Sequence, residues 1–78
     1  MEQNKTLTLA DLRVGERAQV YGISAACPIH RRFLDLGLVP GVSVVCMGKS
    51  PLGDPFCYLI RGKHVAIRRR DARWVFIY

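Results

Sequence analysis

Apolar residues along this chain alternate with polar ones in short stretches, and clusters of glycine, proline and other turn formers separate the stretches. Alternation over four to seven residues, with β-branched and aromatic side chains, is typical of strands. The pattern predicts five short strands, at residues 17–23, 42–47, 56–60, 64–67 and 74–78. Single helical turns are expected over 8–12 and 69–73.

One longer helix is expected between Pro28 and Gly37. Proline suits the first turn of a helix, because the amide that it lacks would have no partner there. Glycine favours the left-handed cap that ends a helix, and Pro40-Gly41 predicts a type II turn just beyond it. We therefore expect Gly37, Pro40 and Gly41 to serve backbone geometry. The apolar face of the helix should consist of Ile29, Phe33, Leu34 and Leu36.

Short strands joined by tight turns leave unpaired edges unless their sheet curls and closes. We therefore expect a mainly β protein of the α+β class: a small, partly open barrel of about five strands with one inserted helix. Residues 1–78 should form a single domain, with 1–6 as a flexible tail. The predicted core is Val20, Leu34, Leu38, Val42, Val44, Leu59, Val65, Ile67, Val75 and Ile77.

Composition narrows the functional classes. The chain has 78 residues, half of them hydrophobic, which argues against disorder, and 12 Lys plus Arg against 6 Asp plus Glu give a net charge of +6. A domain of this size buries only about 60% of the surface that its unfolded chain exposes, which leaves little room for a catalytic pocket. No phosphate-cradling loop or carboxylate pair with a histidine is present in the sequence. We expect a protein that is not an enzyme and needs no cofactor.

The sequence also carries indications of location. No apolar run approaches the roughly 20 residues that span a bilayer, and residues 1–6 are polar where a secretory signal would be apolar. Three cysteines, an odd number, suit free thiols in a reducing compartment. These features predict a cytoplasmic protein.

Two surfaces are candidates for partner binding. In the loop 51–55, Leu52 is an apolar residue among turn formers, so it either packs on one end of the barrel or stands exposed as an anchor. Asp54 is expected to cap the loop backbone rather than bind an ion. The other surface is the helix and its exit. The candidate contact residues are Leu52, Gly53 and Asp54 in the loop, and Arg31, Arg32 and Val39 around the helix.

Two alternatives rest on other residue clusters. Cys27 and His30 lie three apart, and Cys46 and Cys57 are expected to face each other across a hairpin, but buried apolar thiols are the commoner case, so no metal site is assigned. The arginine-rich run 68–73 would form a basic stripe for nucleic acid if it joined the basic residues Arg31, Arg32, Arg61 and Lys63. Interleaved exposed aromatics are missing from the pattern, so a solvated basic face is preferred.

The segments 32–42, 51–55, 62–68 and Asp71-Ala72, in this order and spacing, resemble the ferrous iron transport protein A (FeoA) family over roughly residues 7–77. The resemblance implies an SH3-like barrel in the cytoplasm that acts with the membrane ferrous iron permease FeoB, whose cytoplasmic part contains a GTP-binding domain. The same module is also fused to iron-dependent repressors.

From this resemblance we expect an accessory protein that docks on FeoB and modulates its assembly, gating or GTP-linked activity. It would meet the membrane only through that partner, and an open sheet edge would permit a weak homodimer. A metal sensor or carrier and a nucleic-acid-binding barrel are the alternative functions.

Overall fold

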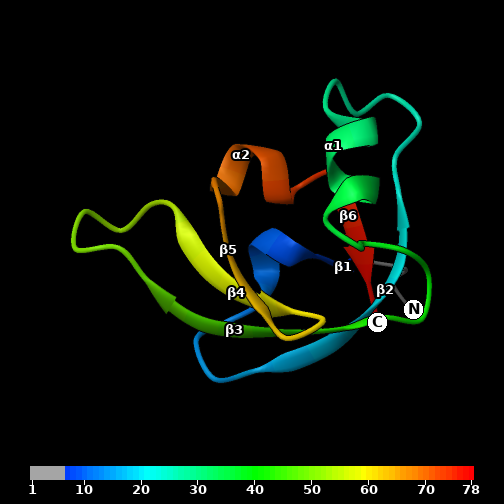
Figure 1. Cartoon of the computed structure of the whole chain (residues 1–78). Coiled ribbons are helices and arrows are strands. Elements are labelled where there is room, and N and C mark those ends of the chain that lie inside the picture. The colour runs from blue at the N-terminus through cyan, green and yellow to red at the C-terminus, as the bar shows by residue number, and fades with distance from the viewer. Residues whose placement is uncertain (1–6) are drawn as a thin grey trace, which may run out of the picture.

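The computed structural model describes residues 7–78, so the tail expected over 1–6 lies outside the described residues. Within these residues nine short elements follow one another (Figure 1): β1 (Leu7–Thr8), η1 (Leu9–Asp11), β2 (Arg17–Ile23), α1 (His30–Asp35), β3 (Ser43–Lys49), β4 (Phe56–Ile60), β5 (Lys63–Ile67), α2 (Arg69–Ala72) and β6 (Val75–Ile77). All five expected strands are present, each end within two residues of its prediction. Strand β1 was not predicted, because its two residues carry no alternation of their own.

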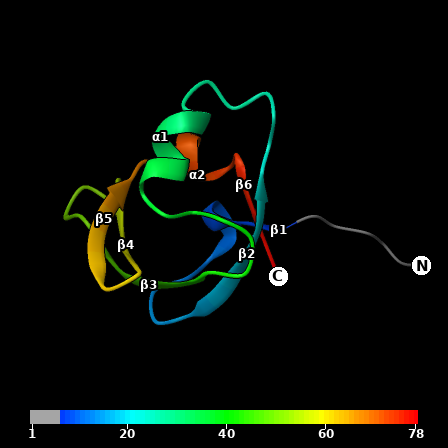
Figure 2. The same ribbon diagram turned by 45° about the vertical axis from the view of Figure 1, so that its right-hand side comes forward.

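The strands form one antiparallel sheet in the order β1-β6-β2-β3-β4-β5. Strand β2 serves both halves of the sheet: residues 17–19 pair with β3, and residues 20–23 pair with β6. A bulge between Val20 and Gly22 interrupts the second pairing, and bulges increase the local twist of a strand. The sheet therefore curls around η1 into the expected small, partly open barrel (Figure 2).

The first and last strands of the sheet order, β1 and β5, do not pair with each other. The helical elements η1 and α2 pack together between them. A buried hydrogen bond crosses this gap, from the hydroxyl of Tyr58 on β4 to the carbonyl oxygen of Leu9 in η1, at 3.2 Å. Side chains and short helical turns thus close the barrel where strand pairing does not.

The core differs from its prediction at one helical position and one strand position. Phe33 is only 2% exposed, whereas Leu34 is 40% exposed, so the prediction that Leu34 fills the barrel is wrong. Successive helical side chains point about 100° apart, and Phe33 lies on the same stripe as Ile29 and Leu36, which pack against the core, so Leu34 points away from that stripe. On β4 the alternation buries Tyr58 and leaves Leu59 half-buried on the outer face. The largest fully buried side chains are Tyr58, Phe33, Leu9, Leu38, Ile60, Val20, Val44, Val75 and Cys46.

The exit from α1 has the geometry that its glycines predict. The amide of Gly37 donates to the carbonyl of Leu34 at 3.0 Å, and the amide of Leu38 donates to that of Phe33 at 3.1 Å, which together form a Schellman cap. Gly37 and Gly41 have φ values of +94° and +91°. The amide of Val42 donates to the carbonyl of Val39 at 3.1 Å around Pro40-Gly41, which completes a type II turn.

We predict that ionisation of Tyr58 weakens the fold at alkaline pH. Burial raises the pKa of Tyr58 from 10.0 to about 12, with a smaller contribution from nearby Cys46. The unfolded phenol ionises from about pH 10, so the stabilisation from the neutral group is complete below that pH and is lost as the pH rises toward 12. The loss should approach 2–3 kcal/mol, because each pKa unit corresponds to about 1.4 kcal/mol.

Tyr58→Phe should cost about 1 kcal/mol near neutral pH, because the Leu9 carbonyl loses one of its two donors. Wild type loses more than this amount between pH 10 and 12, so the two curves of unfolding free energy against pH should cross in that range, and the variant should be the more stable protein beyond the crossing. Urea unfolding across this range, with Tyr21→Phe as the exposed control, measures both curves. Parallel curves for wild type and Tyr58→Phe would contradict the prediction.

Candidate partner-binding site

The loop between β3 and β4 projects beyond the barrel at one end of the molecule (Figure 1). Leu52 is 94% exposed, so the interpretation that it packs on the end of the barrel is wrong. Three hydrogen bonds nevertheless order the loop around it. The Ser50 amide donates to the Pro55 carbonyl at 3.0 Å, the Ser50 hydroxyl donates to the Asp54 carbonyl at 2.7 Å, and the Gly53 amide donates to the Ser50 carbonyl at 2.8 Å. The loop therefore presents an exposed leucine on a backbone that hydrogen bonds keep ordered.

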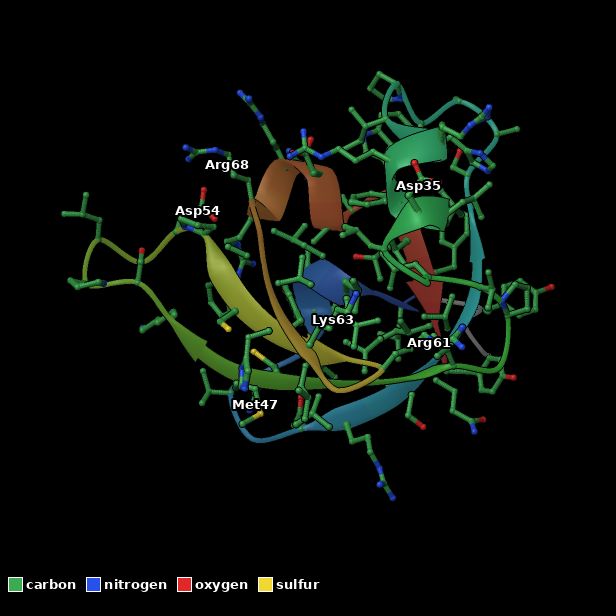
Figure 3. All side chains as sticks on the ribbon, in the orientation of Figure 1. Asp35, Met47, Asp54, Arg61, Lys63 and Arg68 are labelled. Carbon is green, nitrogen blue, oxygen red and sulfur yellow. The ribbon has the colours of Figure 1, made fainter. Side chains whose placement is uncertain are left out.

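Asp54 ties this loop to α2 (Figure 3). Its Oδ1 accepts a hydrogen bond of 2.9 Å from the Arg69 amide, the first amide of α2, and its Oδ2 lies 4.0 Å from the Arg68 guanidinium. The expectation that Asp54 caps its own loop backbone with its side chain is wrong, because the carboxylate caps a helix 15 residues further along the chain. A carboxylate satisfies the free amides of a helix N-terminus, and here it also anchors the base of the loop.

The second candidate surface lies apart from the first. Arg31 and Arg32 are exposed on α1, and Val39 is half-buried just beyond it. In Figure 1 the 51–55 loop projects at the left of the molecule, whereas α1 lies at the upper right. The six candidate contact residues therefore form two separate surfaces and not one continuous patch.

A groove that the sequence analysis missed runs between α1 and the segment β5–α2. It has a volume of about 320 Å³, with Phe33 and Ile67 among its apolar lining and Arg32, Arg68 and Arg70 among its basic lining. The sequence indicated only the arginines of this groove. Phe33 and Ile67 are 34 residues apart in the chain, so their contact with one groove could not be predicted from spacing. The groove links Arg32 to the arginine-rich run.

The wider basic stripe does not form. Arg61 and Lys63 lie at the turn where β5 begins, whereas Arg68 follows the other end of that strand (Figure 3). Arg61 packs against the backbone at Gly37. A Cβ added to Gly37 would lie 2.6 Å from the Cδ of Arg61. The guanidinium of Arg69 stacks over Phe56, 5.3 Å from the ring centroid. Part of the positive charge thus serves intramolecular packing.

The exposed aromatic residues lie elsewhere. Tyr21 and Tyr78 are 66% and 63% exposed, and their rings meet edge to face with 5.9 Å between centroids. The sequence analysis missed this pair, because the two residues are far apart in the chain. They belong to β2 and to the residue after β6, away from α2 and its arginines (Figure 1).

The cysteines do not form the arrangement expected of them. Cys46 pairs with Tyr58 and Gly48 pairs with Cys57, so Cys46 and Cys57 do not face each other across the hairpin. Met47 is an extra residue in β3, and this bulge shifts the register. Cys27 and Cys46 are buried, and burial raises the pKa of the Cys46 thiol. Within residues 7–78, no three His, Cys, Asp or Glu side chains gather as a metal site.

The helices of the described segment are all short. Over residues 7–78, none has both the length and the apolar character that crossing a bilayer requires.

Comparison with known proteins identifies the family to which this barrel belongs. The family model described as the FeoA domain matches residues 7–78. The chain belongs to the FeoA domain family. A fusion protein of Porphyromonas gingivalis, the Fe(2+) transport protein A/Fe(2+) transporter FeoB fusion protein, is 30% identical over 66 residues. That match covers 85% of this chain but only 8% of the fusion protein.

Solved structures of FeoA proteins have the same fold. The FeoA-like protein of Clostridium acetobutylicum is 26% identical with a TM-score of 0.86, and the match covers 97% of this chain and 88% of that one. Stenotrophomonas maltophilia FeoA, solved in complex with zinc and described as an SH3 domain protein, is 29% identical with a TM-score of 0.82. That match covers 92% of this chain and 89% of the other. The prediction of an SH3-like barrel of the FeoA family is confirmed.

We predict that the Asp54 carboxylate stabilises α2 and the base of the loop. Asp54→Ala should lower the free energy of unfolding by about 0.5–2 kcal/mol, because the first amide of α2 loses its acceptor. Asp54→Asn keeps a side-chain oxygen and should cost less. Urea unfolding measures both, with Asp35→Ala as a control that removes an exposed carboxylate from α1. Equal effects of Asp54→Ala and Asp35→Ala would contradict the capping role.

Proposed function

We propose that this chain is a cytoplasmic accessory protein of ferrous iron uptake, which docks on the permease FeoB and modulates its assembly, gating or GTP-linked activity. The similarity to the Porphyromonas gingivalis fusion protein carries this proposal, since that protein joins FeoA and FeoB in one chain. A covalent link keeps two modules together at high effective concentration. A separate FeoA chain needs a contact surface to achieve the same association.

The 51–55 loop supports a docking role through its geometry. Leu52 exposes 94% of its surface, and hydrogen bonds from Ser50 and Gly53 fix the backbone on both sides of it. A loop backbone that is already ordered loses little conformational freedom on binding, so more of the burial of its anchor contributes to affinity. Buried apolar anchors of this kind commonly dominate the energy of an interface. We assign Leu52, Gly53 and Asp54 to the principal contact.

Charge supports a second contact around α1. The chain carries a net charge of +6, and Arg32, Arg68 and Arg70 border the groove between α1 and α2. Such a surface attracts an acidic partner segment and accelerates encounter, an effect that salt screens. We assign Arg31, Arg32 and Val39 to this contact. The proposed role is one of binding and leaves any chemistry to the partner.

Leu52→Asp should weaken capture of the cognate FeoB at least about tenfold, because a charged side chain replaces the apolar anchor. The measurement is a pull-down from detergent-solubilised membranes by the tagged chain at physiological salt. Tyr21→Ser is the matched control, since it removes an exposed aromatic side chain from a distant strand and should leave capture unchanged. Unfolding curves should show that both variants are folded.

Two results would contradict the proposal. Failure of the folded wild-type chain to capture FeoB would remove the docking role. Equal capture by wild type and Leu52→Asp would remove the loop from the interface. Ferrous iron uptake under iron limitation provides a second readout, and it should fall when the chain is deleted.

A further inference from the structure

The outer face of the β3–β4–β5 sheet carries a thiol and an imidazole in contact. The Sγ of Cys57 on β4 lies 3.8 Å from the Nδ1 of His64 on β5. Cys57 pairs directly with Ala66, and His64 pairs with Leu59, so the two side chains meet along a diagonal of the ladder. His64 is exposed and Cys57 is half-buried, so solvent reaches the pair. Nothing in the proposed docking role uses these residues.

The bulge in β3 adds a third donor of the same chemical kind. Met47 is the extra residue between Cys46 and Gly48, and bulges commonly re-aim a side chain. Its side chain is 46% exposed and lies beside β3 on the side turned away from η1 (Figure 3). Met47, Cys57 and Ala66 border the same shallow hollow of about 310 Å³. A thioether therefore lies on the same outer face as the thiol and imidazole.

The separation of Cys57 and His64 suits a shared metal ion. With metal–sulfur and metal–nitrogen bonds of about 2.3 and 2.05 Å, a 3.8 Å separation corresponds to an angle of about 120° at the ion. Both side chains can therefore reach one ion. Together with Met47 this face offers three donors, fewer than the four that structural zinc sites use.

We propose that Cys57, His64 and Met47 form a surface binding site for one Cu(I) ion. Thiolate and thioether sulfur are soft ligands that select Cu(I), and imidazole also suits copper. Binding would transfer the Cys57 thiol proton to solvent and leave a thiolate–copper bond, with no change in oxidation state. The two strands and the bulge place the donors on one face before the ion arrives.

Titration of the whole chain with Cu(I) against a coloured Cu(I) chelator, under ascorbate and without added thiols, tests the site. Wild type should remove one equivalent of copper from the chelator. Cys57→Ser and His64→Gln should each lower the affinity at least about tenfold, and Met47→Leu should lower it by a smaller factor while preserving side-chain volume. His30→Gln is the matched control, because it alters the other histidine and should leave the affinity unchanged.

Circular dichroism should first show that each variant is folded. Failure of wild type to compete for Cu(I), or equal binding by wild type and folded Cys57→Ser, would overturn the site. A higher affinity for Zn²⁺ than for Cu(I) at the same residues would overturn the choice of metal. FeoB capture is expected to be the same for Cys57→Ser and wild type, so the failure of this inference is distinguishable from the failure of the docking proposal.

Discussion

The structure depends on closing a curled sheet whose two edge strands, β1 and β5, do not reach each other to pair. Strand β2 pairs with β3 at one end and with β6 at the other, which curls the sheet, but β1 and β5 at the two ends of the strand order do not pair with each other. The gap is filled by η1 and α2, with the Tyr58 hydroxyl on the Leu9 carbonyl beneath them. This bond links residues 49 positions apart in the sequence, and it is buried.

The same closure places the candidate docking loop. Helix α2 plugs the barrel and points its first amide toward Asp54, so the carboxylate that caps the helix also anchors the β3–β4 hairpin. The loop beyond that anchor is free of core packing, which leaves Leu52 exposed at a defined position. The groove beside α1 lies between that helix and the segment β5–α2, on the same side of the barrel as α2. Both proposed contacts are therefore consequences of how the sheet is closed.

The sequence predicted the features that local chemistry controls. Alternation located the five main strands, and Gly37 and Pro40-Gly41 indicated the turns because only certain residues adopt those backbone angles. Features that depend on distant segments could not be found in this way. The partner of Asp54 is 15 residues away, and the choice of Phe33 over Leu34 depends on where α1 docks. The bulge at Met47 shifts the register that was predicted to place Cys46 opposite Cys57. The groove between α1 and the segment β5–α2 likewise follows from the tertiary fold and not from spacing.

Mapping the contact residue by residue tests the central claim, that this barrel docks on FeoB through its projecting loop. The direct measurement is an NMR titration of the isotopically labelled chain with the cytoplasmic region of its cognate FeoB. The account predicts that the amide signals of Leu52 and Gly53 shift or broaden first, followed by those of Arg31 and Arg32. Unchanged spectra, or changes confined to the outer face around Cys57 and His64, would contradict it.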